Sequence, residues 1–98
     1  MSRRFVVRPQ ADFEITEAAD WYAQRAPGLG GEFVRAVDAA LAAIERNPLQ
    51  HPVVDPPIRR ALLRRFPYSI LFTADDDEIV VLSCFHVRRD PKRWQRPR

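Results

Sequence analysis

The chain has 98 residues, of which 46% are hydrophobic and 30% are charged. This composition favours a globular protein, and the length suits a single domain and excludes a multidomain protein. No apolar run approaches the ~18 residues of a transmembrane helix, and the N-terminus lacks the long apolar stretch of a signal peptide. The one cysteine, Cys84, excludes an internal disulfide and a multi-cysteine metal site, so we expect a cytoplasmic protein without metal, cofactor or membrane contact.

The net charge of +3 is divided unevenly along the chain. Residues 10–57 carry three arginines against eight acids, whereas residues 58–98 carry ten lysines and arginines against five acids. A basic C-terminal half beside an acidic middle is typical of a surface that meets a polyanion or an acidic partner. A solvated charged surface can have the same composition, so the charge alone does not decide between them.

The first part of the chain predicts a strand followed by a helix. Residues 3–8, Arg-Arg-Phe-Val-Val-Arg, are rich in β-formers, and Pro9 ends the run. Residues 10–26 predict an amphipathic helix that Pro27-Gly28 terminates. Its apolar face repeats with helical spacing through Ile15, Ala18, Ala19, Tyr22 and Ala26.

A second helix is predicted over residues 29–46, and Asn47-Pro48 is its stop signal. The connection between the two helices is short, so we expect an antiparallel helical hairpin whose exposed side is acidic. The apolar face of the second helix runs through Phe33, Val37, Ala40, Leu41 and Ile44.

The C-terminal half predicts a meander of strands. Residues 48–57 contain four prolines and predict an irregular connector. Three strand-like runs follow over residues 58–65, 68–73 and 78–88, and the short links between them favour antiparallel pairing. The tail from about residue 90 is basic and contains Trp94.

These elements predict the order β-α-α-β-β-β in a single domain over residues 1–98. Two helices on one face of a mostly antiparallel sheet give a two-layer α+β fold. We expect the first strand at a sheet edge or beside the last strand. Residues 79–85 are apolar nearly throughout, which predicts that both faces of this strand are covered. The helices would cover one face, and either the tail with Trp94 or a second protein would cover the other.

Two segments of the basic half resemble the RelE/ParE superfamily of toxins, and more its ParE branch. One is Arg64-Arg65-Phe66-Pro67-Tyr68, and the other is His86-Val87-Arg88-Arg89-Asp90-Pro91. The resemblance extends from Arg3 to about Trp94. It implies a RelE/ParE-like fold and the toxin component of a type II toxin–antitoxin module of the plasmid stabilisation or addiction type.

The resemblance also implies partners. A cognate, ParD-like antitoxin would neutralise the toxin by folding a disordered C-terminal segment over it, and operator DNA would be contacted only through the antitoxin. We expect that acidic, amphipathic segment between the helical hairpin and the sheet. The ParE branch is associated with inhibition of DNA gyrase, whereas the RelE branch cleaves mRNA in the ribosomal A site.

Cleavage of RNA through the 2′-hydroxyl requires a base, an acid and cations around the phosphorane. The candidates for such a ribonuclease are Arg60, Arg64, His86 and Arg88. RelE-like enzymes tend to carry a tyrosine near the C-terminus, where this chain has Trp94, and an indole N–H cannot act as a general acid. We therefore favour a protein inhibitor of gyrase over an enzyme.

A binding inhibitor needs a surface, not an acid–base pair. The residues expected to contact the target are Arg60, Arg64, Tyr68, His86, Arg88, Arg89 and Trp94. Two alternatives stay open at this point. One is ribosome-dependent mRNA cleavage, and the other is an inactive toxin retained as a co-repressor with its antitoxin.

Overall fold

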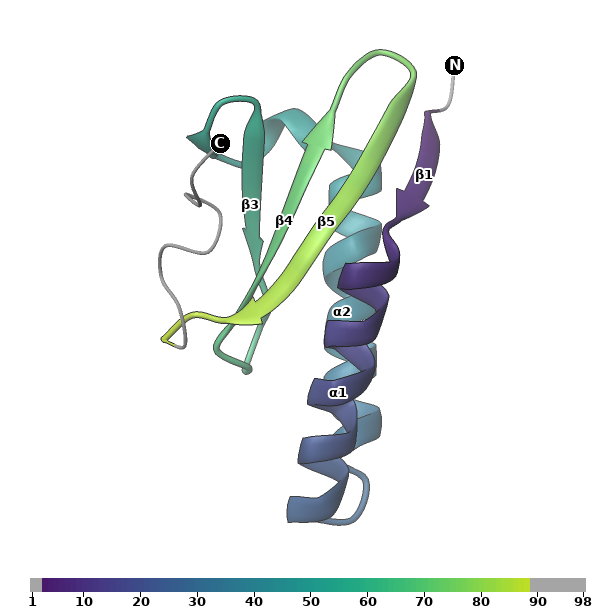
Figure 1. The fold of residues 1–98 in the computed structure, drawn as a ribbon, viewed down its shortest axis with the longest axis vertical. Helices are drawn as coiled ribbons and strands as arrows, with labels where there is room; N and C mark the ends of the chain where they lie inside the picture. Colours follow the sequence, from purple (N-terminus) through teal and green to yellow (C-terminus); the bar gives the residue numbers. More distant parts are fainter. Residues whose placement is uncertain (1–2, 89–98) are drawn as a thin grey trace.

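The computed structural model describes residues 3–88, which form a five-stranded sheet covered on one face by two helices (Figure 1). Along the sheet the strands follow the order β1-β5-β4-β3-β2. The elements are β1 (Arg4–Val7), α1 (Pro9–Arg25), α2 (Leu29–Arg46), a short 3₁₀ helix (Pro48–Gln50), β2 (Val53–Asp55), β3 (Ile58–Leu62), β4 (Tyr68–Ala74) and β5 (Glu78–His86). This is the α+β architecture that the sequence predicts, with one additional strand.

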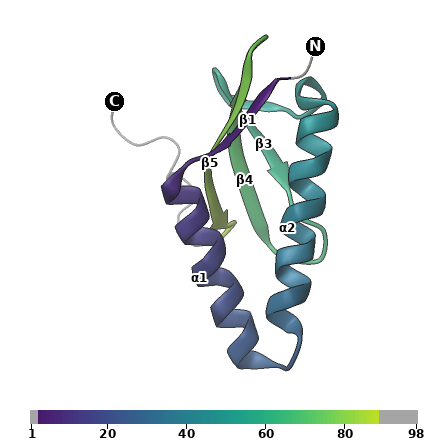
Figure 2. The same ribbon diagram turned by 90° about the vertical axis from the view of Figure 1, so that its right-hand side faces the viewer.

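The two helices form an antiparallel hairpin, as predicted (Figure 2). Gly28 caps α2 with a φ of 82°, a left-handed conformation that costs glycine little. The helices lie close together at Gly30, where an added Cβ would lie 2.7 Å from the carbonyl oxygen of Ala19. Neither helix within residues 3–88 is long and apolar enough to span a membrane.

The core lies between the hairpin and the sheet. The apolar face of α2 is buried there, as its spacing predicts, and meets large side chains from β4 and β5. At one end of the core, four aromatic rings pack with centroids 4.9–6.1 Å apart. They belong to Tyr22, Phe33, Phe66 and Tyr68.

β1 satisfies both predictions for the first strand, because it is an edge strand and lies beside β5. The pairing is parallel and runs from Arg4 opposite Glu78 to Val7 opposite Val81. Beyond Val81, β5 has no neighbouring strand on this side among the described residues, so its second half forms an open edge next to α1.

β5 is not covered equally on its two faces. Ile79, Val81 and Cys84 are buried against the helices, whereas Val80 and Leu82 on the other face are half-buried. Near the end of the strand the cover is complete, because Phe85, next to Cys84, is only 5% exposed. Val81 and Cys84 are three residues apart, so in a regular strand their side chains would point to opposite faces. The β4–β5 register shifts by one residue between them, at Leu82, and both side chains therefore point into the core. The strand that is buried throughout its first five residues is the central strand β4.

The boundaries differ from the prediction mainly in the basic half. β3 ends at Leu62 and not at Arg65, and Arg65 adopts a φ of 72° in the turn that leads to β4. β5 ends at His86. The proline-rich connector, predicted to be irregular, contains β2, which pairs with β3 at the edge of the sheet where prolines do not interrupt a ladder.

Candidate macromolecule-binding surfaces

A groove with a volume of about 790 Å³ lies between α2 and β3. Four alanines of α2 form its floor, namely Ala36, Ala39, Ala40 and Ala43. Their small side chains leave room between the helix and the strand. Phe66 closes one end, and Leu62, 59% exposed, forms part of the opposite wall.

Within residues 3–88, the part of β3 beyond Arg60 has no neighbouring strand on the side of the groove. β2 pairs with β3 only at Ile58 and Arg59, and the backbone N–H of Arg60 donates to the Pro52 carbonyl oxygen at 3.0 Å. The backbone N–H of Leu63 points towards β4 and donates to the Tyr68 carbonyl oxygen. Because the backbone groups of successive residues point to opposite sides of a strand, the N–H and C=O of Leu62 point away from β4. The groove therefore offers backbone hydrogen-bonding groups as well as apolar surface.

The rim of the groove is basic. Its charged residues are Arg35, Arg46, Arg64, Arg65 and the acid Glu32. The Arg65 guanidinium donates to the Glu32 carboxylate at 2.9 Å, so the turn after β3 is tied to the start of α2. The other three arginines form no ion pair with residues 3–88. An acidic partner would therefore meet a positive field at this rim.

Of the predicted site residues, Arg60 and Arg64 lie on different parts of the surface. Arg60, half-buried, sits in β3 opposite Leu71 and projects from the face of the sheet turned away from the helices. Arg64 is exposed and lies beyond the end of β3, on the rim of the groove. β3 ends between them, so strand alternation does not keep the two arginines on one side of the sheet.

Tyr68, His86 and Arg88 lie close together where β4 begins and β5 ends. The rings of Tyr68 and His86 meet edge to face, with their centroids 5.3 Å apart. The backbone N–H of Arg88 donates to Nδ1 of His86 at 3.0 Å, which fixes this imidazole beside the strand end. Tyr68 is buried in the core, so it offers little surface to a partner. Arg89 and Trp94 lie outside the described residues.

A second hollow of about 330 Å³ lies between α1 and the open edge of β5, and the sequence did not indicate it. Its acids are Glu14, Glu17 and Asp20, and Trp21 stands at its rim with the Arg25 guanidinium 4.1 Å above the ring centroid. A single Glu14 oxygen accepts hydrogen bonds from the Ser83 hydroxyl at 2.9 Å and the Cys84 backbone N–H at 2.8 Å. Glu14 thus closes an edge at which another strand could add.

The thiol of Cys84 is buried beside this carboxylate. Burial and, to a smaller extent, the charge of Glu14 raise the pKa of the thiol to about 12. A thiol that stays protonated at neutral pH is neither a nucleophile nor a metal ligand. Among residues 3–88 no group of three histidines, cysteines or carboxylates is placed to hold a metal ion.

The chain is similar to known proteins in both its sequence and its fold. Residues 5–91 match the family described as "ParE toxin of type II toxin-antitoxin system, parDE". The fold is similar to that of a solved structure described as "Chromosomal ParDE TA system from P. aeruginosa", with a TM-score of 0.76 and 19% sequence identity over 87% of this chain and 96% of that chain. No match is found among the curated proteins. Because the family match covers most of its length, the chain belongs to the ParE toxin family of type II toxin–antitoxin systems.

Proposed function

We propose that this toxin inhibits DNA gyrase and is neutralised by a cognate antitoxin whose acidic, amphipathic segment folds into the groove between α2 and β3. The observation that carries the antitoxin site is the groove itself, which combines an alanine floor, an exposed Leu62 and a basic rim. An unstructured acidic segment with regularly spaced leucines or valines fits all three features.

The dimensions of the floor suit a helical partner. Ala36, Ala39, Ala40 and Ala43 follow the i, i+3, i+4, i+7 spacing of one helix face, which extends over about 10 Å, or two turns. Small residues let a second helix approach closely, so large aliphatic side chains of the partner can fill the groove. Folding on binding costs roughly 2–5 kcal/mol, which burial of these side chains must exceed.

Two arguments support gyrase as the target: the family to which the chain belongs, and a basic surface that could bind a large partner. A poison that traps an enzyme needs only a higher affinity for one of its states. His86 and Arg88 form a hydrogen-bonded unit at the end of β5, and Arg60 adds a second cation from β3. Cations on these strands can hold a large, negatively charged assembly. The side chains that we assign to target contact are Arg60, Arg64, His86 and Arg88, with Arg89 from the segment that follows.

The antitoxin site is tested by filling the groove. Ala39 is exposed on the floor, so Ala39→Trp should occupy the groove without disturbing the core. We expect the affinity for the antitoxin, measured by calorimetry, to fall by about 30-fold or more, the loss typical of a binding hot spot. Ala42→Trp is the matched control, since Ala42 is also exposed on α2 but does not line the groove. Equal affinities for the two variants would refute the groove.

The target is tested with the purified toxin in a gyrase supercoiling assay. We expect supercoiling to fall as toxin is added, to recover with antitoxin, and to be affected less by Arg88→Ala or Arg60→Ala. Arg25→Ala removes an exposed arginine of α1 that lies over Trp21, and it should leave inhibition unchanged. Cleavage of ribosome-bound mRNA that His86→Ala abolishes would replace gyrase with the ribosome. Activity in neither assay, with operator binding alongside the antitoxin, would indicate a co-repressor.

A further inference from the structure

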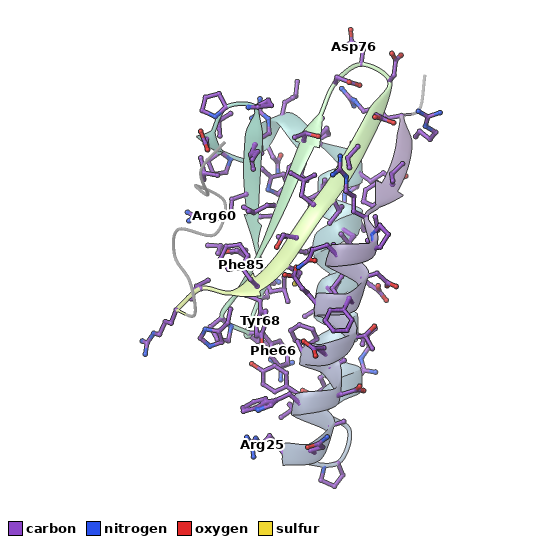
Figure 3. The ribbon with its side chains drawn as sticks, in the orientation of Figure 1. Arg25, Arg60, Phe66, Tyr68, Asp76 and Phe85 are labelled. Atoms are coloured by element: carbon purple, nitrogen blue, oxygen red, sulfur yellow. The ribbon has the colours of Figure 1, made fainter. Side chains whose placement is uncertain are left out.

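The groove between α2 and β3 is bridged at one end. Arg65, in the turn after β3, donates to the carboxylate of Glu32 in the first turn of α2, and both residues line the groove. Phe66 lines the same end and packs on Phe33 of α2, with ring centroids 5.3 Å apart. Figure 3 shows Phe66 next to Tyr68, where β4 begins. A partner helix that lies in the groove therefore ends at this ion pair.

The opposite end of the groove, where α2 ends, is not bridged in this way. Arg46 lines this end, and no residue of the connector 47–57 lines the groove. Arg35 and Arg46 are separated by about 16 Å along the axis of α2, at a rise of about 1.5 Å per residue. A partner helix of about three turns thus fits between the two ends.

Positive charge is distributed unevenly between these ends. Arg65 is held in its ion pair, whereas Arg35 and Arg64 form no ion pair with residues 3–88. Arg64 lies next to Arg65 on the wall. The Arg35 guanidinium reaches back along α2, to 3.5 Å from the position of a Cβ on Gly31. Arg35 and Arg64 therefore lie at the bridged end, together with the partial positive charge of the α2 N-terminus, and Arg46 lies at the other end.

We propose that the antitoxin segment binds as a helix antiparallel to α2, with acidic side chains in its last turn between Arg35 and Arg64. The inference rests on the proposed antitoxin site and adds the direction and the charge pattern of the partner. The C-terminus of a helix carries a partial negative charge, which is stabilised by cations and by the N-terminus of a neighbouring helix. A helix in the opposite direction would place its positive end beside the two arginines.

This charge pattern couples the folding of the segment to its binding. Acids in the last turn destabilise an isolated helix, because they lie at the negative end of its own dipole. A helix of three turns is also too short to be stable alone in water. Arg35 and Arg64 remove the repulsion, so the segment becomes helical in the groove. Because Arg64 is also assigned to target contact, the bound segment covers part of the surface that the target would meet.

Two synthetic peptides of about three helical turns test the charge pattern. Both have acetylated and amidated ends and leucines at i, i+3, i+4 and i+7, and they carry two glutamates in either the last or the first turn. Measured by fluorescence anisotropy with the full chain, the peptide with glutamates in its last turn should bind about fivefold or more tightly. Arg64→Ala should remove most of this preference, whereas Arg46→Ala should weaken both peptides alike. Equal affinities or the reverse preference would overturn the proposal.

A nitroxide on the peptide tests the direction without any change in the toxin. On the last residue of the peptide that ends in glutamates, it should broaden the amide NMR signals of Glu32 and Arg64 more strongly than that of Asn47. On the first residue of the same peptide, it should broaden Asn47 more strongly. The opposite pattern would show that the helix runs parallel to α2, and the proposal would be wrong.

Ala39→Trp separates this inference from the proposed antitoxin site. If Ala39→Trp weakens both peptides, they lie in the groove, and equal affinities would then overturn the charge pattern alone. If the peptides bind and Ala39→Trp has no effect, the groove itself is wrong and the antitoxin site with it. Binding of neither peptide would also overturn the charge pattern, whereas calorimetry with the antitoxin would still decide the site.

Discussion

Glu14 shows how much of this fold depends on one carboxylate. It is 69 and 70 residues from Ser83 and Cys84 in the sequence, yet it accepts a hydrogen bond from each. A partly buried N–H that loses its acceptor costs free energy, because water cannot fully replace the lost hydrogen bond. An N–H in contact with water has no such cost. The interaction therefore joins α1 to the part of β5 that no neighbouring strand reaches among the described residues.

Glu14→Ala should lower the free energy of unfolding by roughly 1–3 kcal/mol, since it leaves the Cys84 N–H without this acceptor. Urea denaturation followed by circular dichroism measures the change. Glu14→Gln retains an acceptor oxygen and should lose less. Asp12→Ala, at an exposed position in the first turn of the same helix, serves as control. A loss no greater in Glu14→Ala than in Asp12→Ala would contradict the assigned role.

Cys84 gives the stability a dependence on alkaline pH. Its thiol has a pKa of about 12 in the folded chain, against 9.0 for an ordinary cysteine. The raised pKa stabilises the fold fully below about pH 9, and this contribution is lost as the pH rises towards 12, because only the unfolded thiol ionises. Unfolding free energies from pH 7.5 to 10.5 should fall more steeply for the natural chain than for Cys84→Ala. Parallel slopes would show that the thiol is not protected.

At the scale of the elements, the crossing of α1 and α2 depends on a missing side chain. A Cβ at Gly30 would lie 2.7 Å from the Ala19 carbonyl oxygen and 2.9 Å from the Ala23 Cβ, so the helices would have to separate. Gly31, one residue further, has no atom closer than 3.5 Å to such a Cβ. The hairpin therefore has no room for a side chain at Gly30, whereas it has room for one at Gly31.

We expect Gly30→Ala to destabilise the protein by about 1–3 kcal/mol through overpacking. Gly31→Ala should instead be neutral or stabilising by up to ~1 kcal/mol, because alanine is the better helix former. Thermal unfolding of the two variants under the same conditions compares them directly. If both substitutions shift the melting temperature in the same direction, the close crossing at Gly30 is not the determinant.

At the scale of the whole molecule, the groove and the modest chain length predict that the toxin depends on its antitoxin for stability. A partner present at about a thousand times its dissociation constant adds about 4 kcal/mol to the folded state. For a chain of this size, 1 kcal/mol corresponds to roughly 4–8 °C in melting temperature. The complex should therefore melt on the order of 15 °C or more above the free toxin, and Ala39→Trp should abolish most of this difference. Calorimetry of both species measures it, and coincident melting temperatures would argue against a stabilising partner at this site.

The sequence predicted what depends on local pattern. α2 was predicted over residues 29–46 and found there, because its apolar spacing, Pro27-Gly28 and Asn47-Pro48 are all local signals. β2 was not predicted, because its three residues form a strand only by pairing with β3. In the candidate site, too, the local features could be predicted and those that depend on distant segments could not. The basic residues were visible in the sequence, but the separation of Arg60 from Arg64 depends on where β3 ends, and the alanine floor becomes a groove only opposite that strand.

The parallel pair of β1 and β5 joins almost the first described residues to almost the last. Arg4 lies opposite Glu78, with a guanidinium–carboxylate contact of 2.8 Å between them, so this edge of the sheet closes only after nearly the entire polypeptide is available. Contacts between such distant segments form late and slow the folding reaction. During translation the two helices are therefore synthesised well before β5, the strand that packs on them and pairs with β1.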